Sequence, residues 1–212
     1  MQHLEIEFKT GLSQQEFQSL LTYFEQAPAV EQTNYYIDSS DFVLRQNRLA
    51  LRIRTFKDGG ELTLKIPQEV GSLEHNQALT KQECQTLLSS FSLPPGKIAD
   101  LLVARGVHIQ ELEILGHLTT LRREQLTSIG LMALDQNTYF GITDYELELE
   151  VTEVQEGQKN FLAFLEERKI GYKKLKSKIA RFSQNLANSW KFPFFLVEWY
   201  IVKQVNEAGN SY

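Results

Sequence analysis

The sequence is very poor in cysteine, with Cys84 the only one among 212 residues. A single cysteine cannot form an internal disulfide, so the composition favours a protein of a reducing compartment. Cys84 lies among polar residues, just before Leu87 and Leu88, and no nucleophile motif surrounds it. We interpret it as an ordinary helix residue, because reactive cysteines sit in recognisable electropositive surroundings.

The sequence also lacks long apolar runs and an excess of basic charge. No apolar stretch approaches the ~20 residues that a membrane-spanning helix needs, and the first residues show no secretory signal. The formal net charge of −5 argues against broad binding of nucleic acid, which depends on a basic surface. We therefore expect a cytoplasmic protein with no nucleic-acid partner and no stable membrane insertion.

What the sequence does contain is alternation of apolar and charged residues, which is typical of strands with two different faces. The clearest examples are residues 3–9, 49–54, 61–66 and 145–151. Weaker candidates are residues 33–38, 72–80, 117–127 and 130–135. Asp58, Gly59 and Gly60 predict a hairpin turn between two of these strands.

Helical patterns separate some of the strands. Ser13 opens the first, residues 13–26, with Glu16 three positions later as a capping-box partner. Further helices are expected at residues 81–90, 96–105, 158–169 and 174–189. Gly171 is a natural C-terminal cap for the helix at residues 158–169. No repeat or low-complexity linker is present, so we expect one domain over residues 1–189. Residues 190–212 form an apolar tail.

The charged faces of these strands carry rows of ionisable groups, while the opposite faces are almost wholly apolar. A single strand of this kind would normally turn its polar face to water. Here two predicted helices have one apolar stripe each, which suits them to cover the apolar faces from outside. The charged faces would then line the inside of a closed sheet, and eight strands enclose room for one small ligand.

Charges inside a barrel need partners. Carboxylate rows suit Mg²⁺ or Mn²⁺, which prefer oxygen ligands. Arginine and lysine rows suit phosphate oxygens, arginine through its two-pronged donor geometry. Both kinds of row together predict a metal-bridged triphosphate as the ligand.

These residues resemble the CYTH superfamily, the triphosphate tunnel metalloenzymes, which include class IV adenylate cyclases, thiamine triphosphatases and inorganic tripolyphosphatases. Glu5-Ile6-Glu7-Phe8-Lys9 matches its Glu-x-Glu-x-Lys signature. The further motifs follow in the family's order: Tyr36-Ile37-Asp38, Leu51-Arg52-Ile53-Arg54, Thr63-Leu64-Lys65, Arg122 with Glu124, Leu134-Asp135, Glu146-Leu147-Glu148 and Ser177-Lys178. The set covers about residues 1–187 and is most similar to the small single-domain CYTH proteins of Gram-positive bacteria.

The resemblance implies an α+β fold, with an eight-stranded antiparallel closed β-barrel and helices packed on its outside. Its tunnel would bind a triphosphate-bearing small molecule with Mg²⁺ or Mn²⁺. By matched position the metal ligands would be Glu5, Glu7, Glu146 and Glu148, with Asp135 or Glu150 as helpers. Phosphate oxygens would be held by Lys9, Arg52, Arg54, Lys65 and Arg122, and by Lys178 reaching in from the C-terminal helix.

Among these residues, the resemblance assigns Lys9, Glu7 and Glu148 to the catalytic centre, without a single general base. Other residues receive weaker assignments. Glu74 and Glu124 are further candidates for the lumen, Tyr36 and Asp38 are expected to support the fold, Arg123 should point outward, and His3 should lie at a tunnel mouth. For the lysines near Lys178, a solvated basic face is an equal alternative.

The implied activity is hydrolysis of a triphosphate, either inorganic tripolyphosphate or an organic one. One alternative is an adenylate cyclase that makes cyclic AMP from ATP. Another is a polyphosphate-binding or nucleotide-binding module without turnover. The tail at residues 190–212 would pack on the domain, close a tunnel mouth or join two copies in a homodimer; a membrane-surface contact and an appended extension are alternatives.

Overall fold

The computed structural model describes residues 2–189. The chain forms two compact units, Met1–Lys176 and Ser177–Tyr212. Of the second unit the structure describes α6 (Lys178–Ser189) and the residue before it. The expected domain boundary after residue 189 and the tail at residues 190–212 lie outside the described residues and stay predictions.

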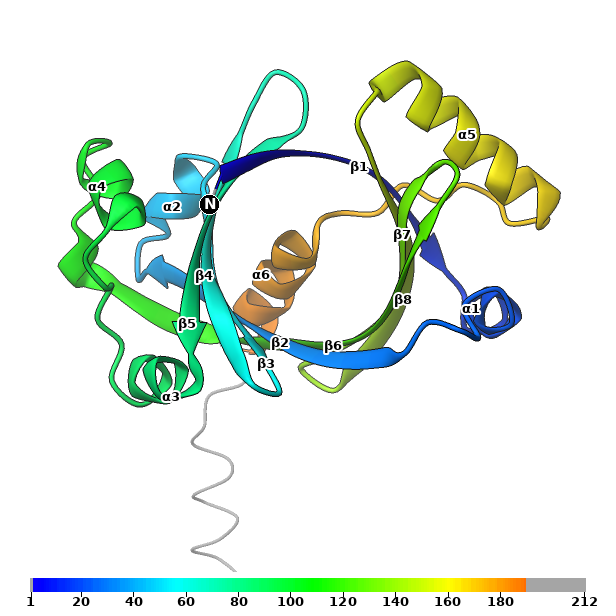
Figure 1. Ribbon diagram of the computed structural model, residues 1–212. Coiled ribbons are helices and arrows are strands. Elements are labelled where there is room, and N and C mark those ends of the chain that lie inside the picture. The colour runs from blue at the N-terminus through cyan, green and yellow to red at the C-terminus, as the bar shows by residue number, and fades with distance from the viewer. Residues whose placement is uncertain (1, 190–212) are drawn as a thin grey trace, which may run out of the picture. The chain divides into compact units, whose positions relative to one another are not determined.

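The first unit is a closed antiparallel barrel of eight strands in the order β1-β5-β4-β3-β2-β6-β7-β8 (Figure 1). The strands are β1 (Gln2–Leu12), β2 (Ala29–Ser39), β3 (Ala50–Phe56), β4 (Gly59–Pro67), β5 (Ser72–Thr80), β6 (Leu112–Thr127), β7 (Gly130–Tyr139) and β8 (Ile142–Val151). All eight expected strands are therefore confirmed, as is the closed barrel. Closure depends on β1, which pairs with both β5 and β8.

Strand β6 begins at Leu112, five residues before the expected start at 117. The register between β2 and β6 shifts between Tyr36 and Ile37, where Gly116 faces Tyr36 and Ile114 faces Ile37. This bulge inserts one extra residue into β6 and breaks its two-residue alternation. The alternation in the sequence therefore marked only the part of β6 that follows the bulge.

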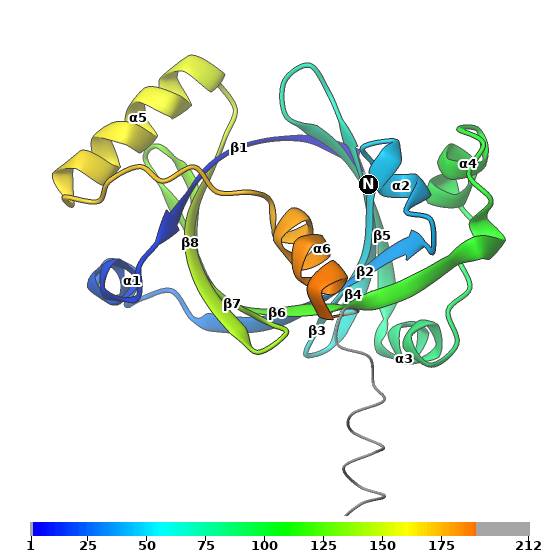
Figure 2. The same cartoon turned by 180° about the vertical axis from the view of Figure 1, so that it is seen from behind.

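The helices of this unit are α1 (Gln14–Leu21), α2 (Val43–Gln46), α3 (Lys81–Ser89), α4 (Lys97–Val103) and α5 (Val154–Glu167), with a short 3-10 turn at Ile109–Glu111. They lie outside the barrel, with α1 and α5 on one side and α2, α3 and α4 on the other (Figure 2). The Ser13–Glu16 capping box is present at α1. No helix among residues 2–189 is long and apolar enough to span a membrane.

The apolar core lies between the barrel wall and these helices. One cluster joins the outer faces of β3 and β4, including Leu51 and Leu62, to Leu87 of α3 and Leu102 of α4. A second cluster joins β7 and β8 to α1 and α5. Each fully buried leucine or phenylalanine stabilises the fold by roughly 1.5–3 kcal/mol. The apolar strand faces therefore point outward under helices, as expected.

Several helix boundaries differ from expectation. Helix α1 ends at Leu21 instead of residue 26, and α5 begins at Val154 instead of residue 158. Helix α5 ends at Glu167, and Lys169, not Gly171, adopts the left-handed conformation (φ 57°) that closes it. Helix α6 begins at Lys178 instead of residue 174. The backbone of Lys173 is bonded to β1, where its N–H donates to the Thr10 hydroxyl at 2.8 Å. Residues 171–177 are not helical, so Lys174 lies before the helix that Lys178 begins.

Candidate active site

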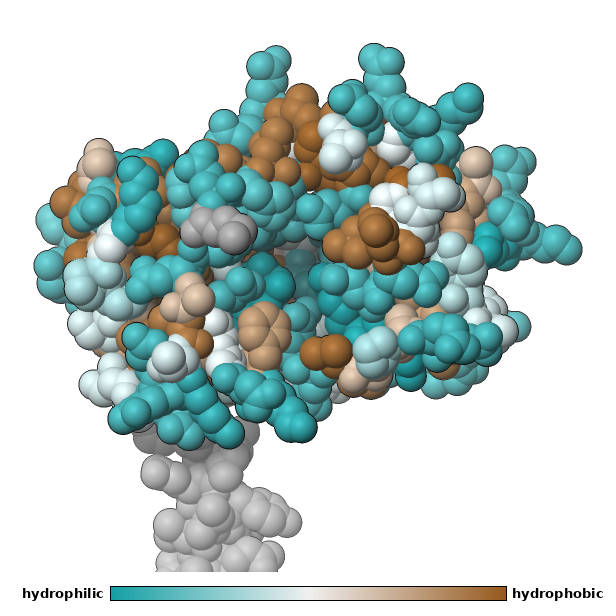
Figure 3. All heavy atoms as spheres, in the orientation of Figure 1, coloured by the Kyte–Doolittle hydropathy of each residue, from teal (hydrophilic) through white to brown (hydrophobic). Residues whose placement is uncertain are grey.

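Strand alternation turns one row of side chains from each strand into the barrel. Lys9 is the cross-strand partner of Glu148, and Asp135 is the partner of both Arg122 and Glu146. The space-filling view down the barrel shows a hollow at the centre of this face, with mostly hydrophilic residues around it (Figure 3). The rows of charge predicted from the sequence therefore face one another across an enclosed space.

A carboxylate cluster occupies the wall formed by β7 and β8. Asp135, Glu146 and Glu148 are all buried, and each contributes an oxygen atom within 4.8 Å of the others. The Asn137 side-chain amide donates to Glu146 at 3.0 Å, and the hydroxyl of Thr120 donates to Asn137 at 2.7 Å. Buried carboxylates crowded this closely require positive charge nearby.

Arg122 of β6 supplies part of that charge. Its guanidinium donates two hydrogen bonds to Asp135, at 2.8 and 2.6 Å, and one to Glu148 at 2.5 Å. Burial alone would lower the pKa of Arg122, but Asp135 and Glu148 raise it well above its usual value. Arg122 is therefore held as a cation directly against the carboxylate cluster.

Glu7 and Lys9 of β1 extend this site across the seam of the barrel. The ammonium of Lys9 contacts Glu7 and lies 3.2 Å from Glu148. Burial in the lumen raises the pKa of Glu7, and the charge of Glu148 raises it further, against the opposing effect of Lys9. A divalent cation in the lumen would favour the ionised carboxylate and oppose both effects.

The wall opposite this cluster, called the basic wall below, carries Arg52, Arg54 and Lys65, each of them beside a carboxylate. Lys65 of β4 lies 2.5 Å from Glu5 and 2.6 Å from Glu74, while Arg52 of β3 lies 3.9 Å from Glu74. Lys65 and Arg52 outweigh the effect of burial and lower the pKa of Glu74 to about 2. Glu74, given only a weak assignment from the sequence, therefore faces the lumen as an ionised carboxylate.

Arg54 lies beside Arg52 on the same face of β3. Its Nε donates to the Asn34 carbonyl oxygen at 3.1 Å, and its nearest carboxylate is Glu61 at 3.6 Å. Burial, together with the charges of Arg52 and Arg122, lowers the pKa of Arg54 to about 10. Three guanidinium groups that repel one another in a buried space make a site suited to an anion.

A model of the CYTH domain family matches residues 3–183 of the chain. The chain belongs to the CYTH domain family. It is 35% identical over 190 residues to YjbK of Bacillus subtilis, a candidate triphosphatase, covering 89% of this chain and 98% of YjbK.

Two solved CYTH-like structures are similar over most of the chain. A candidate adenylate cyclase from Bacillus halodurans is 35% identical with a TM-score of 0.81, covering 85% of this chain and 98% of that one. HpAC1 from Hippeastrum, a candidate adenylyl cyclase described as having a dominant triphosphatase activity, is 27% identical with a TM-score of 0.75. The alignment covers 86% of this chain and 96% of HpAC1.

The expected metal ligands of this CYTH protein do not all lie together. Asp135, expected only as a helper, is fully buried at the centre of the cluster with Glu146 and Glu148. Glu5 is paired with Lys65, and Glu150 lies at the rim, 3.2 Å from His3. The alternation of charge in the sequence cannot tell which of these carboxylates lie together, because all of them occupy the same face of their strands.

The remaining expectations concern single residues. Glu124 lies 3.5 Å from Arg122, whereas Arg123 turns outward and donates to the Ala27 carbonyl. Asp38 supports the fold by accepting from backbone N–H groups around α2. Cys84 is buried on α3, and burial raises the pKa of its thiol. Lys178 is the first residue of α6 in the second unit, and its reach into the tunnel stays a prediction.

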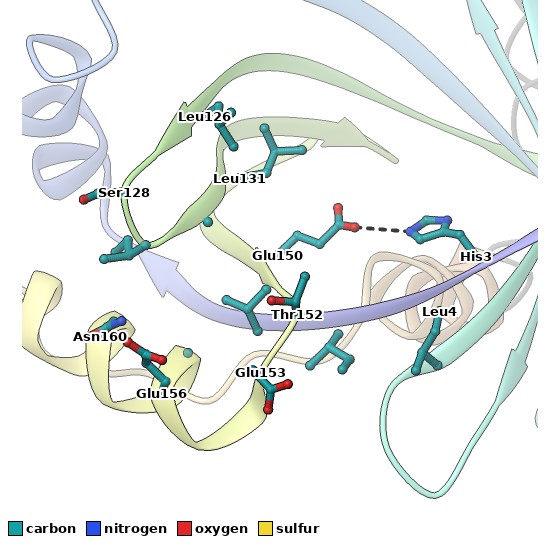
Figure 4. Close-up of a pocket in the computed structure, with 15 residues that line it drawn as sticks. His3, Leu4, Leu126, Ser128, Leu131, Glu150, Thr152, Glu153, Glu156 and Asn160 are labelled. Atoms are coloured by element: carbon teal, nitrogen blue, oxygen red, sulfur yellow. Dashed lines mark hydrogen bonds and ion pairs between the residues drawn. The ribbon is translucent and has the colours of Figure 1, made fainter.

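A groove of about 620 Å³ adjoins the rim where His3 meets Glu150 (Figure 4). The β6–β7 hairpin lines it with Leu126 and Leu131, and the start of α5 lines it with Glu156. Leu126 is 82% exposed, although it is a large apolar residue. The groove offers space for an organic group next to the tunnel mouth, which the sequence did not indicate.

Proposed function

We propose that this CYTH protein hydrolyses a triphosphate, inorganic tripolyphosphate or an organic one, inside its barrel with the help of a divalent cation. The observation that carries the proposal is the division of one enclosed lumen into a carboxylate wall and a basic wall. The first suits a metal ion and the second suits phosphate oxygens. The triphosphatase description of two similar proteins supports the same activity.

The donor set fits a hard cation such as Mg²⁺ or Mn²⁺. Asp135, Glu146 and Glu148 provide only oxygen atoms, which these ions prefer. Glu7 is the fourth candidate ligand, because it lies in the lumen beside Lys9, where burial and then the nearby charge of Glu148 raise its pKa. Once bound, such an ion would neutralise charge on phosphate oxygens and lower the pKa of a water molecule.

The chain's own residues would hold and orient the substrate. Arg52, Arg54 and Lys65 are placed to bind phosphate oxygens from the basic wall. Arg122 lies between the two walls. It donates hydrogen bonds to Asp135 and Glu148 of the carboxylate wall, and its charge lowers the pKa of Arg54 on the basic wall. A phosphoryl group near Arg122 would therefore meet positive charge where the reaction builds negative charge on its oxygens.

Phosphate release from tripolyphosphate, ATP and thiamine triphosphate, measured with Mg²⁺ and with Mn²⁺, tests the proposal. We expect release from one or more of them, its loss when a chelator removes the metal, and its return when metal is added back. Folded protein that releases no phosphate from any of the three would contradict the enzyme claim. Calorimetric binding of tripolyphosphate by such a protein would favour a binding module instead.

Neighbouring arginines provide a matched pair of variants. Arg122→Gln should lower kcat/KM by roughly 100-fold or more, as loss of a preorganised charge donor does. Arg123→Gln makes the same substitution on the outer face, and its kcat/KM should stay within about twofold of the wild type. Glu148→Gln should lower metal-dependent activity by roughly 100-fold and leave the protein folded. Unchanged activity in both Arg122→Gln and Glu148→Gln would show that the site lies elsewhere.

Conversion of ATP to cyclic AMP is the second candidate function. The groove beside His3 and Glu150 favours it, because a cyclase must hold a nucleoside next to the triphosphate. Adenylate cyclase is also the description of the Bacillus halodurans structure. Cyclic AMP and pyrophosphate as the products from ATP would support this reaction, whereas orthophosphate as the product supports hydrolysis.

The preference for Mg²⁺ or Mn²⁺ and a cytoplasmic location belong to the proposal. The first rests on the all-oxygen donor set, and competition between the two ions in the phosphate assay tests it. The second rests on the single cysteine of the sequence. A homodimer formed through residues 190–212 is a prediction about residues that the structure does not describe.

A further inference from the structure

Three buried hydrogen-bond donors on the basic wall have no hydrogen-bond partner among residues 2–189. They are Nδ2 of Asn34 on β2, Nε of Arg52 on β3 and Oγ1 of Thr63 on β4. Asn34 is 1% exposed and Thr63 is 0% exposed. More than nine-tenths of buried polar groups in folded proteins are paired, so three unpaired donors on adjacent strands call for a specific explanation.

The strand register places these donors next to one another. Thr63 is the cross-strand partner of Arg52, and Asn34 is the partner of Arg54. Directly opposed side chains have Cβ atoms roughly 5 Å apart, and diagonal ones roughly 7 Å. All of them occupy the strand face that carries the lumen charges. The donors therefore outline one small area of the lumen wall.

Local bonds fix the direction of the Asn34 amide. Its carbonyl oxygen accepts from Nε of Arg54 at 3.1 Å, which leaves Nδ2 on the other side of the amide. An amide nitrogen and a guanidinium nitrogen can only donate, and a threonine hydroxyl can donate as well as accept. The missing partner must therefore supply acceptor oxygens. The adjacent charges of Arg52 and Arg54 select an anion.

We propose that Asn34 and Thr63, together with Arg52, form a phosphate subsite that uses uncharged donors beside the guanidinium groups. The proposal rests on the proposed triphosphate substrate. In the barrel order, β3 and β4 lie across the lumen from β8 and β7, which carry the carboxylate cluster. The subsite therefore holds the end of the substrate that is farther from the carboxylates, which in tripolyphosphate is the part released as pyrophosphate.

Isosteric changes separate this role from a structural one. Thr63→Val keeps the shape of the side chain and removes a hydroxyl that has no partner in the free protein. Its melting temperature should equal or exceed that of the wild type, while KM for tripolyphosphate rises roughly tenfold, the loss expected for a hydrogen bond to a charged group. A residue needed only for folding would show the reverse, a lower melting temperature with unchanged KM.

Asn34→Asp provides the second variant. The carboxylate still accepts from Arg54, so the fold is retained, but it replaces a donor by a negative charge that repels phosphate. We expect weaker binding of tripolyphosphate and weaker product inhibition by pyrophosphate, each by tenfold or more, because a repelling charge adds to the lost bond. Thr33→Val is the matched control: its hydroxyl lies on the outer face of β2 and is already bonded to Thr119 at 3.0 Å. This control should leave KM unchanged.

Calorimetric binding of tripolyphosphate, measured alongside hydrolysis, keeps the two proposals distinguishable. Affinity for tripolyphosphate that falls in Thr63→Val and Asn34→Asp but not in Thr33→Val supports the subsite, with or without turnover. Affinity and KM within twofold of the wild type in both lumen variants would overturn the subsite and leave triphosphate hydrolysis standing. Wild-type protein that binds tripolyphosphate but does not hydrolyse it would instead overturn the proposed activity.

Discussion

At the scale of single residues, the role of each charged side chain is set by its neighbours across the strands. Glu5 and Glu148 are both glutamates that face the lumen. Glu5 meets Lys65, whereas Glu148 meets Arg122 and lies in the buried carboxylate cluster. Three carboxylates that converge within 4.8 Å can share one cation, and Glu5 is not among them, so we expect Glu148 to contribute more to metal binding than Glu5.

Glu74 gives a prediction about stability and pH. Its pKa in the folded protein is about 2, below the ordinary value of 4.5. Ionised Glu74 therefore stabilises the fold above pH 4.5, and this contribution is lost as the pH falls from 4.5 toward 2. Glu74→Gln should be less stable than the wild type near neutral pH, because Arg52 loses its charged partner and Lys65 loses one of two.

Urea unfolding at a series of pH values tests this prediction. Below pH 4.5 the stability gap between wild type and Glu74→Gln should narrow, by at most about 1.4 kcal/mol per pH unit, the limit for one proton. A gap that stays constant through this range would show that Glu74 titrates at its ordinary pKa.

At the scale of secondary-structure elements, the short helix α2 depends on one carboxylate. Asp38, at the end of β2, accepts from the backbone N–H groups of Ser39, Leu44 and Arg45 at 2.9, 2.8 and 3.0 Å. A helix of one turn cannot stabilise itself, because its first N–H groups have no partner within the helix. Asp38 therefore supports the connection between β2 and β3.

Asp38→Ala should lower the free energy of unfolding by about 2 kcal/mol, since several bonds to a charged acceptor are lost. Ser13→Ala, which removes the hydroxyl of the α1 capping box, should lower it by about 1 kcal/mol. Both variants should keep kcat/KM for tripolyphosphate, because neither side chain is placed in the site. Chemical denaturation and steady-state rates, measured together, check the pair. A fall in kcat/KM for Asp38→Ala without loss of stability would place Asp38 in the site instead.

At the scale of the whole barrel, the apolar faces of the strands point outward and the polar faces point inward, the reverse of the arrangement in a sandwich of two sheets. The apolar clusters lie outside the strands under the helices, and the lumen is lined with charge. Burial, and then neighbouring like charge, raises the pKa of Glu7 and lowers that of Arg54, so the charged forms of both side chains are destabilised in the free protein. A ligand that supplies both a cation and an anion should relieve both kinds of repulsion.

Tripolyphosphate added with Mg²⁺ should therefore raise the melting temperature of the wild type. At 100 times its dissociation constant, a ligand that binds only the folded state adds about 2.7 kcal/mol of stability. Hydrolysis is avoided by using Ca²⁺ or a non-hydrolysable triphosphate in a parallel measurement. Arg122→Gln should show a smaller shift and Arg123→Gln the full one. Equal shifts in the two variants would place the ligand outside the lumen.

The sequence by itself determined the strands, the face of each strand that carries charge, and the capping box at Ser13. These features depend on spacing between near neighbours, which alternation and capping patterns record directly. The ordered motifs identified the family for the same reason. Asn34 and Thr63 lie on the same strand faces as the charged residues. The sequence did not identify them as site residues, because an uncharged polar residue is common on any strand.

Only the tertiary structure decided which of these side chains meet. Barrel closure pairs β1 near the N-terminus with β8, which places Lys9 against Glu148, and the β6–β7 pairing places Arg122 against Asp135. The bulge at Gly116 and the bond between Lys173 and Thr10 also depend on segments distant in the chain. Such contacts join residues more than a hundred positions apart in places, and no local pattern encodes them. The division of the lumen into a carboxylate wall and a basic wall is therefore a property of how the strands are ordered around the barrel.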